Sequence, residues 1–135
     1  MMAYPITDIR GISSDIAEVL KSEGIRTTIG LLRVAGTPKQ RLRIAKKIGT
    51  DTRDVLEWVT AADRMRVKGV GTEYAELLRL AGVKTVSDLQ FRNAQNLFER
   101  MREANKNNLV RLLPKEKTVE RWIENAKKLQ PVIRY

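Results

Sequence analysis

The sequence repeats its own pattern after 58 positions, and this duplication constrains the fold more than any single segment does. Nine positions match without a gap, and nearly all of them are apolar residues or glycines. A chain built twice from one pattern is expected to fold as two similar units. The matched pairs are Ile9/Val67, Gly11/Gly69, Ile16/Tyr74, Ala17/Ala75, Leu20/Leu78, Gly24/Gly82, Ile25/Val83, Thr27/Thr85 and Leu31/Leu89.

A second stretch of similarity follows at a larger offset. Trp58 corresponds to Trp122, 64 positions later, so the second copy carries six extra residues. We place them between Asn105 and Lys117, where Asn and Pro residues predict turns. The chain is therefore expected to divide into residues 1–62 and residues 63–135, either as two small domains or as one compact domain. The further pairs at this offset are Val55/Val119, Val59/Ile123 and Ala62/Ala126.

Each unit is expected to be helical. In the first unit, apolar residues recur at helical spacing in residues 14–23, 38–48 and 52–62. Thr37, Pro38 and Gln40 have the pattern of an N-cap, a first-turn proline and a capping-box partner. No segment alternates as a half-buried strand does. We predict an all-α fold of two repeated units, each of about four to five helices, packed as a pseudo-two-fold pair.

Side chains can be assigned to the surface or the core from the same periodicity. Trp58, Trp122, Phe91 and Phe98 are interpreted as core residues, because large aromatic side chains at helical spacing are usually buried. Residues 38–48 form a basic helix whose charged side is expected to face solvent. Its cations are Lys39, Arg41, Arg43, Lys46 and Lys47, and its expected inward residues are Leu42, Ile44, Ala45 and Ile48.

The composition favours a polyanionic partner and removes most catalytic chemistry. The net charge is +10, and residues 63–135 account for +7 of it with 16 basic against 9 acidic residues. Such an excess is typical of proteins that bind nucleic acid or an acidic membrane surface. With no histidine and no cysteine, the sequence excludes disulfides, thiol nucleophiles, the usual zinc sites and imidazole acid–base catalysis.

The remaining residue types form no recognisable catalytic group. The aspartates fall at expected helix ends or beside basic residues, where helix stabilisation explains them. A lyase based on a reactive lysine is the enzymatic alternative, but no lysine is singled out by its neighbours. No apolar run of roughly 18 residues and no signal-peptide pattern occur. We therefore expect a cytoplasmic, non-enzymatic protein without cofactor, metal or membrane contact.

The best-formed repeated segment is residues 67–71, Val-Lys-Gly-Val-Gly, which leads into a predicted helix. Two glycines around one apolar residue allow a tight turn with positive φ and exposed N–H groups. Unpaired amides and the positive end of the helix dipole together favour an anion. A dinucleotide-binding loop is rejected, because no strand precedes the glycines and Tyr74 stands where a third glycine would be.

These residues resemble the helix-hairpin-helix motif. Residues 67–71 with Ala75 follow its pattern of apolar residue, any residue, Gly, apolar residue, Gly, three residues and Ala. Residues 81–89, Ala-Gly-Val-Lys-Thr-Val-Ser-Asp-Leu, resemble the helix-hairpin-helix domains at the N-terminus of recombinases and the C-terminus of the RNA polymerase α subunit. Residues 6–129 are similar to an uncharacterised family of small bacterial proteins with two such motifs.

The resemblance implies a specific set of phosphate contacts. In DNA-binding members, backbone N–H groups of the hairpin and of the following helix hold a phosphate of one strand, usually without reading bases. Further cations, from Lys115 to Lys128, could extend this basic surface if they face the same way. The residues carried over are Gly69, Val70, Gly71 and Thr72 with the cations Arg66 and Lys68, and in the first unit Gly11, Ile12, Ser13 and Ser14 with Arg10.

Two features depart from a hairpin dedicated to DNA. Ser13 stands where the second glycine would be, although its hydroxyl could also donate to a phosphate. Asp15 and Glu73 occupy equivalent positions in the first helical turn, where a carboxylate stabilises the helix but repels a phosphate. If these acids dominate, the hairpins are purely structural turns that join packed helices.

The sequence thus leaves two functions open. The first is non-enzymatic, sequence-tolerant nucleic-acid binding through the hairpins, with DNA favoured over RNA, and the basic second half supports it. The second is a protein-interaction or scaffold module in which the hairpins only brace the helices, and Asp15 and Glu73 support it. The pattern leaves the oligomeric state open.

Overall fold

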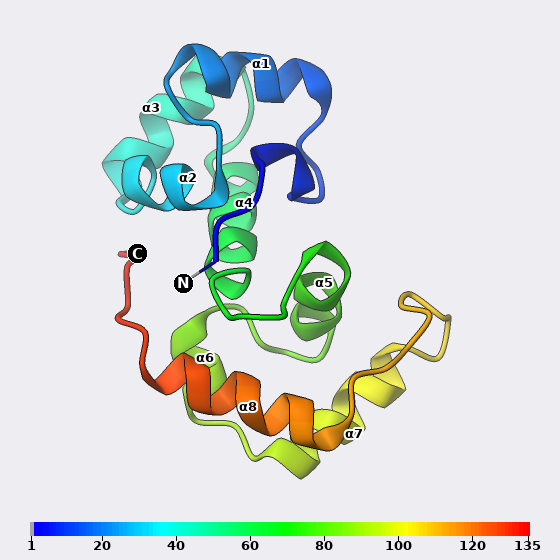
Figure 1. Ribbon diagram of the computed structural model, residues 1–135. Helices are drawn as coiled ribbons and strands as arrows, with labels where there is room; N and C mark the ends of the chain where they lie inside the picture. The colour runs from blue at the N-terminus through cyan, green and yellow to red at the C-terminus, as the bar shows by residue number, and fades with distance from the viewer. Residues whose placement is uncertain (1) are drawn as a thin grey trace.

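The computed structural model describes residues 2–135 and shows an all-helical fold (Figure 1). In these residues no strand forms, and Pro5 and Thr27 make only an isolated bridge. The predicted all-α class is confirmed. The elements in chain order are η1 (Ile6–Asp8), α1 (Ser14–Ser22), α2 (Thr28–Val34), α3 (Pro38–Ile48), α4 (Thr52–Arg64), α5 (Thr72–Leu80), α6 (Val86–Gln90), α7 (Ala94–Ala104) and α8 (Glu116–Lys127).

Helix ends follow local signals in the sequence. At the start of α3, Thr37 and Gln40 form the predicted capping box with Pro38 in the first turn. The same helix ends at Gly49, whose φ of 83° is the left-handed conformation that glycine adopts without a steric penalty. Satisfying the free amides and carbonyls of a helix end is a local problem, so short sequence patterns predict it well.

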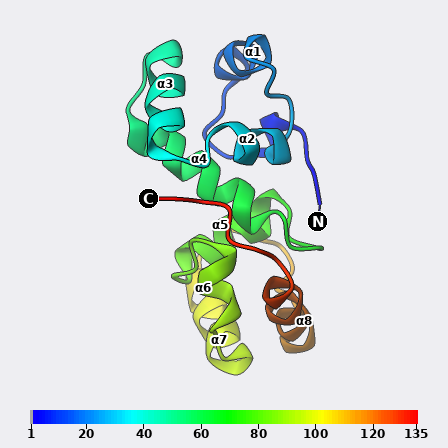
Figure 2. The same ribbon diagram turned by 90° about the vertical axis from the view of Figure 1, so that its left-hand side faces the viewer.

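The helices of the two halves pack in the same order. In the first half, α4 packs against α2 and α3, and α1 packs against α3. In the second half, α8 packs against α6 and α7, and α5 packs against α7. Contact between α4 and α5 joins the halves, as both views show (Figures 1 and 2). The buried apolar side chains of both halves form one continuous core.

The segment after α8 returns from the second half to the first. Arg134 N donates to Gly36 O at 2.7 Å, and Arg41 Nη2 donates to Arg134 O at 2.6 Å. The guanidinium of Arg66 donates to Gln130 O at 2.9 Å and holds the start of this segment. Figure 2 shows the segment crossing α4. We call residues 130–135 the strap.

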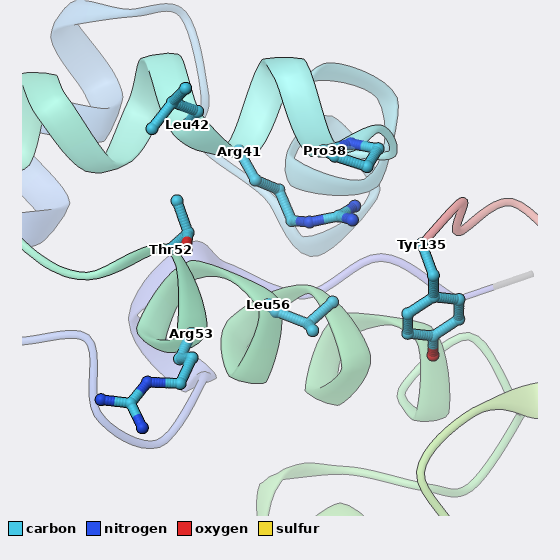
Figure 3. Close-up of a pocket in the computed structure, with 7 residues that line it drawn as sticks. All are labelled: Pro38, Arg41, Leu42, Thr52, Arg53, Leu56 and Tyr135. Atoms are coloured by element: carbon cyan, nitrogen blue, oxygen red, sulfur yellow. The ribbon is translucent and has the colours of Figure 1, made fainter.

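The surface of α3 differs from the expectation at two neighbouring positions. Arg41 is buried and Leu42 is exposed, the reverse of the prediction. Arg41 shares a helical stripe with Ile44 and Ala45, and its Nη1 also donates to Ala35 O at 3.2 Å. The guanidinium of Arg41 thus donates to a carbonyl of a turn and to a carbonyl of the strap. These bonds hold the side chain in the space between α3 and α4 (Figure 3).

Phe91 is also not the core residue that was predicted, because 86% of its surface is exposed. It follows α6, where the preceding residue, Gln90, takes the inward position and donates to the carbonyls of Ala126 and Leu129. Phe98 packs against the core in part, whereas Trp58 and Trp122 are buried as expected.

Candidate functional site

Two glycine turns precede α1 and α5, and each is held in the same backbone conformation. We call residues 9–13 the first hairpin and residues 67–71 the second hairpin. Gly11 has a φ of 96° and Gly69 a φ of 90°, which side chains other than glycine rarely adopt. The predicted positive φ is therefore present at Gly69 but not at Gly71, whose φ of -94° is open to any residue.

A tryptophan lies directly behind each of these glycines. A Cβ atom on Gly11 would lie 3.2 Å from Nε1 of Trp58, and one on Gly69 would lie 3.2 Å from Nε1 of Trp122. Both distances are tighter than an ordinary van der Waals contact. The turns therefore need glycine for space as well as for backbone conformation.

The central amide of each hairpin is used within the turn itself. Ile12 N donates to Ile9 O at 3.2 Å, and Val70 N donates to Val67 O at 3.0 Å. The side chains of Ile12 and Val70 are buried. These two residues were predicted to contact phosphate through their amides, but their N–H groups already have acceptors.

The two helices that follow the hairpins begin differently. At α1, the N-cap Ser13 accepts a hydrogen bond from Ile16 N at 3.3 Å. At α5, the N-cap is Gly71 and no side chain caps the helix. A Cβ at Gly71 would meet no atom within 4 Å. The first turn of α5 therefore presents uncapped backbone amides to open space. Ser14, in the first turn of α1, lies at a helix start that Ser13 caps.

A cavity of about 430 Å³ lies at the open start of α5. Its lining combines the second hairpin and α5 with the loop of residues 105–115, between α7 and α8. From this loop, Arg111 brings a cation that the sequence did not single out. The lining residues are Gly69, Gly71, Thr72, Glu73, Tyr74, Arg111 and Leu112.

Specific hydrogen bonds hold this loop in place. Tyr74 Oη donates to Leu112 O at 2.8 Å, which fastens the loop to α5. The side chain of Asn105 accepts from Val110 N at 2.8 Å and donates to Val110 O at 3.2 Å. Asn108 turns the loop with a φ of 56°. The clustered asparagines were the only signal for this wall of the cavity, and they did not show which way Arg111 points.

Of the two predicted flanking cations, only Lys68 is on the surface. Arg66 is 3% exposed, and its Nη2 lies 2.6 Å from Asp63 Oδ1. The other oxygen of Asp63 accepts from Val86 N at 2.8 Å. Arg66 is thus a buried structural residue, and its assignment to a phosphate surface is corrected.

Arg64 is buried in the same way. Its Nε donates to Ala75 O at 2.8 Å and its Nη1 to Lys84 O at 2.9 Å. Burial lowers the pKa of Arg64 to about 10, while nearby Glu76 opposes the shift. The guanidinium remains a cation at neutral pH, and its hydrogen bond to Ala75 O connects α4 to α5.

Two further candidate residues link the hairpins to each other. Thr72 Oγ1 donates to Asp8 O at 2.7 Å, and Arg10 Nη1 lies 3.7 Å from Glu76 Oε1. The bidentate hydrogen bond from Arg79 lowers the pKa of Glu76 and keeps its carboxylate charged. The approach to the first hairpin therefore rests against α5, so the two hairpins are neighbours.

The cavity combines groups that attract an anion with one that repels it. Glu73 lines the cavity, and its carboxylate opposes the amides and Arg111 there. Across residues 2–135, no three carboxylates gather where they could hold a metal ion. None of the helices in this part of the chain has the length and apolarity needed to cross a bilayer.

The fold and the site define a basic, all-helical domain with two glycine hairpins, one of them followed by a helix without a side-chain cap. Residues 10–129 match a protein family described as "Domain of unknown function (DUF4332)", and the chain belongs to this family. No curated protein and no solved structure matches the chain.

Proposed function

We propose that the chain binds nucleic acid without catalysing a reaction, by holding backbone phosphates at the second hairpin. The observation that carries this proposal is the uncapped start of α5, which opens on a cavity that Arg111 also lines. Backbone amides at a helix N-terminus are strong donors to a phosphate, and the helix dipole adds to the attraction.

The proposal treats the halves as tandem helix-hairpin-helix units. The helices α1 and α5 begin 58 positions apart, and both follow a glycine of positive φ beside a tryptophan. The packing order of the helices is also the same in both halves. A preference for DNA over RNA rests on the resemblance to DNA-binding members, and contacts made only to the backbone would tolerate any base sequence.

Surface cations around the cavity supply the long-range attraction. Lys68 is exposed beside the second hairpin, and Arg111 is exposed on the loop. Among residues 2–135, neither forms an ion pair with an acid, in contrast to Arg79 or Arg102. A cation without a protein partner is free to neutralise a phosphate and release its counterion.

Salt-titrated binding tests the proposal. Labelled duplex DNA, single-stranded DNA and RNA would be titrated with wild type, Lys68→Gln and Arg111→Gln, and with Lys46→Gln on α3 as the matched control. On duplex DNA, each cation that contacts one phosphate contributes about 0.9 to the slope of log affinity against log salt. We expect both site variants to lose about that much slope and the control to keep it. Absence of binding at low salt, or unchanged slopes in both site variants, would reject the proposal.

A protein-interaction role is the second candidate, and the exposure of Phe91 favours it. Phenylalanine is among the residue types most often buried, which makes Phe91 the side chain to test for a protein contact. If this role is correct, Phe91→Ser should abolish concentration-dependent self-association in light scattering and leave DNA binding unchanged. A monomer at every concentration in wild type would argue against a second copy as the partner.

A further inference from the structure

The buried residue Trp122 has an indole N–H that is not paired within the protein. Trp122 is only 2% exposed, yet its N–H has no hydrogen-bond acceptor in residues 2–135. Every fully buried side-chain nitrogen or oxygen in this part of the chain has a partner, so the indole nitrogen must reach solvent. Nε1 lies just beneath the position that a side chain on Gly69 would fill. Because Gly69 has no side chain, the indole N–H is accessible from outside the protein at this point.

We propose that Trp122 Nε1, the uncapped amides of α5 and Arg111 together form one binding site for a backbone phosphodiester. This inference rests on the proposed function and assigns a ligand-binding role to a residue of α8 that packing alone would explain. Gly69 joins the parts of the site, because it lines the cavity and is also the residue above the indole nitrogen.

The chemistry of the indole suits an oxyanion. The indole N–H is a donor and not an acceptor, so this nitrogen can bind a phosphate oxygen but cannot accept a hydrogen bond from another N–H group. A neutral donor adds a hydrogen bond without displacing a counterion. The contribution of Trp122 to affinity should therefore be independent of salt, unlike the contributions of Lys68 and Arg111.

Tyr74 orients both the indole and the loop. Its ring centroid lies 5.3 Å from that of Trp122, with the ring planes at 54°. Its hydroxyl donates to Leu112 O, next to Arg111. One side chain of α5 thus positions two donors that come from different parts of the sequence. The carboxylate of Glu73 also lines the cavity and limits its affinity for an anion.

The first hairpin supplies a matched control. Gly11 covers Trp58 at the same distance, and Trp58 is likewise buried without an acceptor for its N–H in the described residues. There, however, Ser13 caps α1. Without open helix amides beside it, the indole of Trp58 is not expected to bind phosphate.

Mutagenesis would compare Trp122→Phe with Trp58→Phe in the full chain, after circular dichroism has shown that both variants are folded. Affinity for duplex DNA would be measured by anisotropy at several salt concentrations. We expect Trp122→Phe to weaken binding about tenfold or more with an unchanged salt slope, since hydrogen bonds to charged groups are strong. Trp58→Phe should bind within about twofold of wild type. Equal effects of the two substitutions would overturn the assignment.

A second measurement needs no folded Trp122 variant. The chain has two tryptophans, so its ¹H–¹⁵N spectrum contains two indole N–H signals, and Trp58→Phe identifies them. We expect duplex DNA to shift the Trp122 signal downfield and leave the Trp58 signal in place. A stationary Trp122 signal at saturating DNA would overturn the inference while leaving phosphate binding by Lys68 and Arg111 intact. An equal shift with inorganic phosphate at the same phosphate concentration would overturn the assignment to a nucleic-acid backbone. Failure of the proposed function would instead appear as no salt-dependent binding in wild type.

Discussion

The two hairpins share a backbone conformation and differ in how the next helix begins. Both have a glycine of positive φ above a tryptophan, and both are followed by an acid in the first helical turn. Ser13 caps the start of α1 with its hydroxyl, whereas Gly71 leaves the start of α5 without a side-chain cap. The comparison separates two roles for glycine. The first glycine of the motif is required by the fold, and the second determines whether the helix end is available to a ligand.

The surroundings of the hairpins extend this difference. The loop of residues 105–115 between α7 and α8 walls the second hairpin and adds Arg111, whereas three residues join α3 to α4 in the first half. The first hairpin instead directs its cation, Arg10, toward Glu76 on α5. The second half thus holds the candidate site, and the first half contacts the helix on which that site is built.

The largest loss of stability is expected at Gly11 and Gly69, because both hairpins require glycine at this position. Gly69→Ala and Gly11→Ala should each lower the free energy of unfolding by about 1–3 kcal/mol, because a side chain at this φ is strained and meets an indole. Urea unfolding measures the change. Gly71→Ala is the control and should cost less than about 1 kcal/mol, since its Cβ enters open space and only the N-cap preference for glycine is lost. A markedly smaller loss at Gly11 than at Gly69 would show that the two turns are not equivalent.

Exchanging the N-cap residues of α1 and α5 tests whether the open amides of α5 bind phosphate. Gly71→Ser gives α5 the cap that α1 has, and we expect DNA affinity to fall about twofold to tenfold, the range of one ordinary hydrogen bond. The helix itself should gain a few tenths of a kcal/mol. Ser13→Gly opens the first hairpin and should leave affinity unchanged or increase it. Tighter binding by Gly71→Ser would contradict the role given to the open amides.

The equivalent acids should respond differently to neutralisation. Glu73→Gln removes a negative charge from the cavity and should tighten DNA binding by about 0.3–1 kcal/mol, the usual range for a charge at a helix end. Asp15→Asn should leave affinity unchanged. Both substitutions should lower helix stability by similar small amounts, which thermal unfolding would detect. If both acids change affinity equally, the effect is one of net charge and not of the site.

The smallest effect concerns the contact between the first hairpin and α5. The hydrogen bond from Arg79 depresses the pKa of Glu76 below its ordinary value of 4.5. The stabilisation from Glu76 is therefore complete above pH 4.5 and is lost as the pH falls through the lower value in the folded state. Glu76→Gln should be less stable than wild type by a few tenths of a kcal/mol at pH 7. This difference should shrink when urea unfolding is repeated near pH 3, and a difference that persists there would exclude the charge as its cause.

The fold was largely predictable because its determinants are local. Thr37, Pro38 and Gly49 specify the two ends of α3 from residues within one turn, and the structure confirms them. The inward face of the same helix was misassigned, because the carbonyls that Arg41 satisfies belong to a turn and to the strap. A hydrophobic pattern contains no information about which distant carbonyl lacks a donor.

The candidate site was predictable in its backbone and less so in its charges. The turn at Gly69 has the predicted positive φ, whereas Gly71 is extended. Arg66 was assigned to the surface, but Asp63 and Gln130 draw it into the core. Arg111 was missed, because its position depends on the path of a loop that Asn105 and Tyr74 fasten. Long-range hydrogen bonds decided each of these cases.

The strap imposes an order on assembly. It joins residues 93 positions apart through Arg41 and Arg134, about two thirds of the 135-residue chain. Closing so long a loop costs conformational entropy that a few hydrogen bonds repay only when both ends are already held in place. Gly36 is set before α3, and Gln130 directly after α8, so docking requires both halves to be formed. The strap therefore reports completed folding of the whole chain, and its amides should be the last to gain protection from hydrogen exchange.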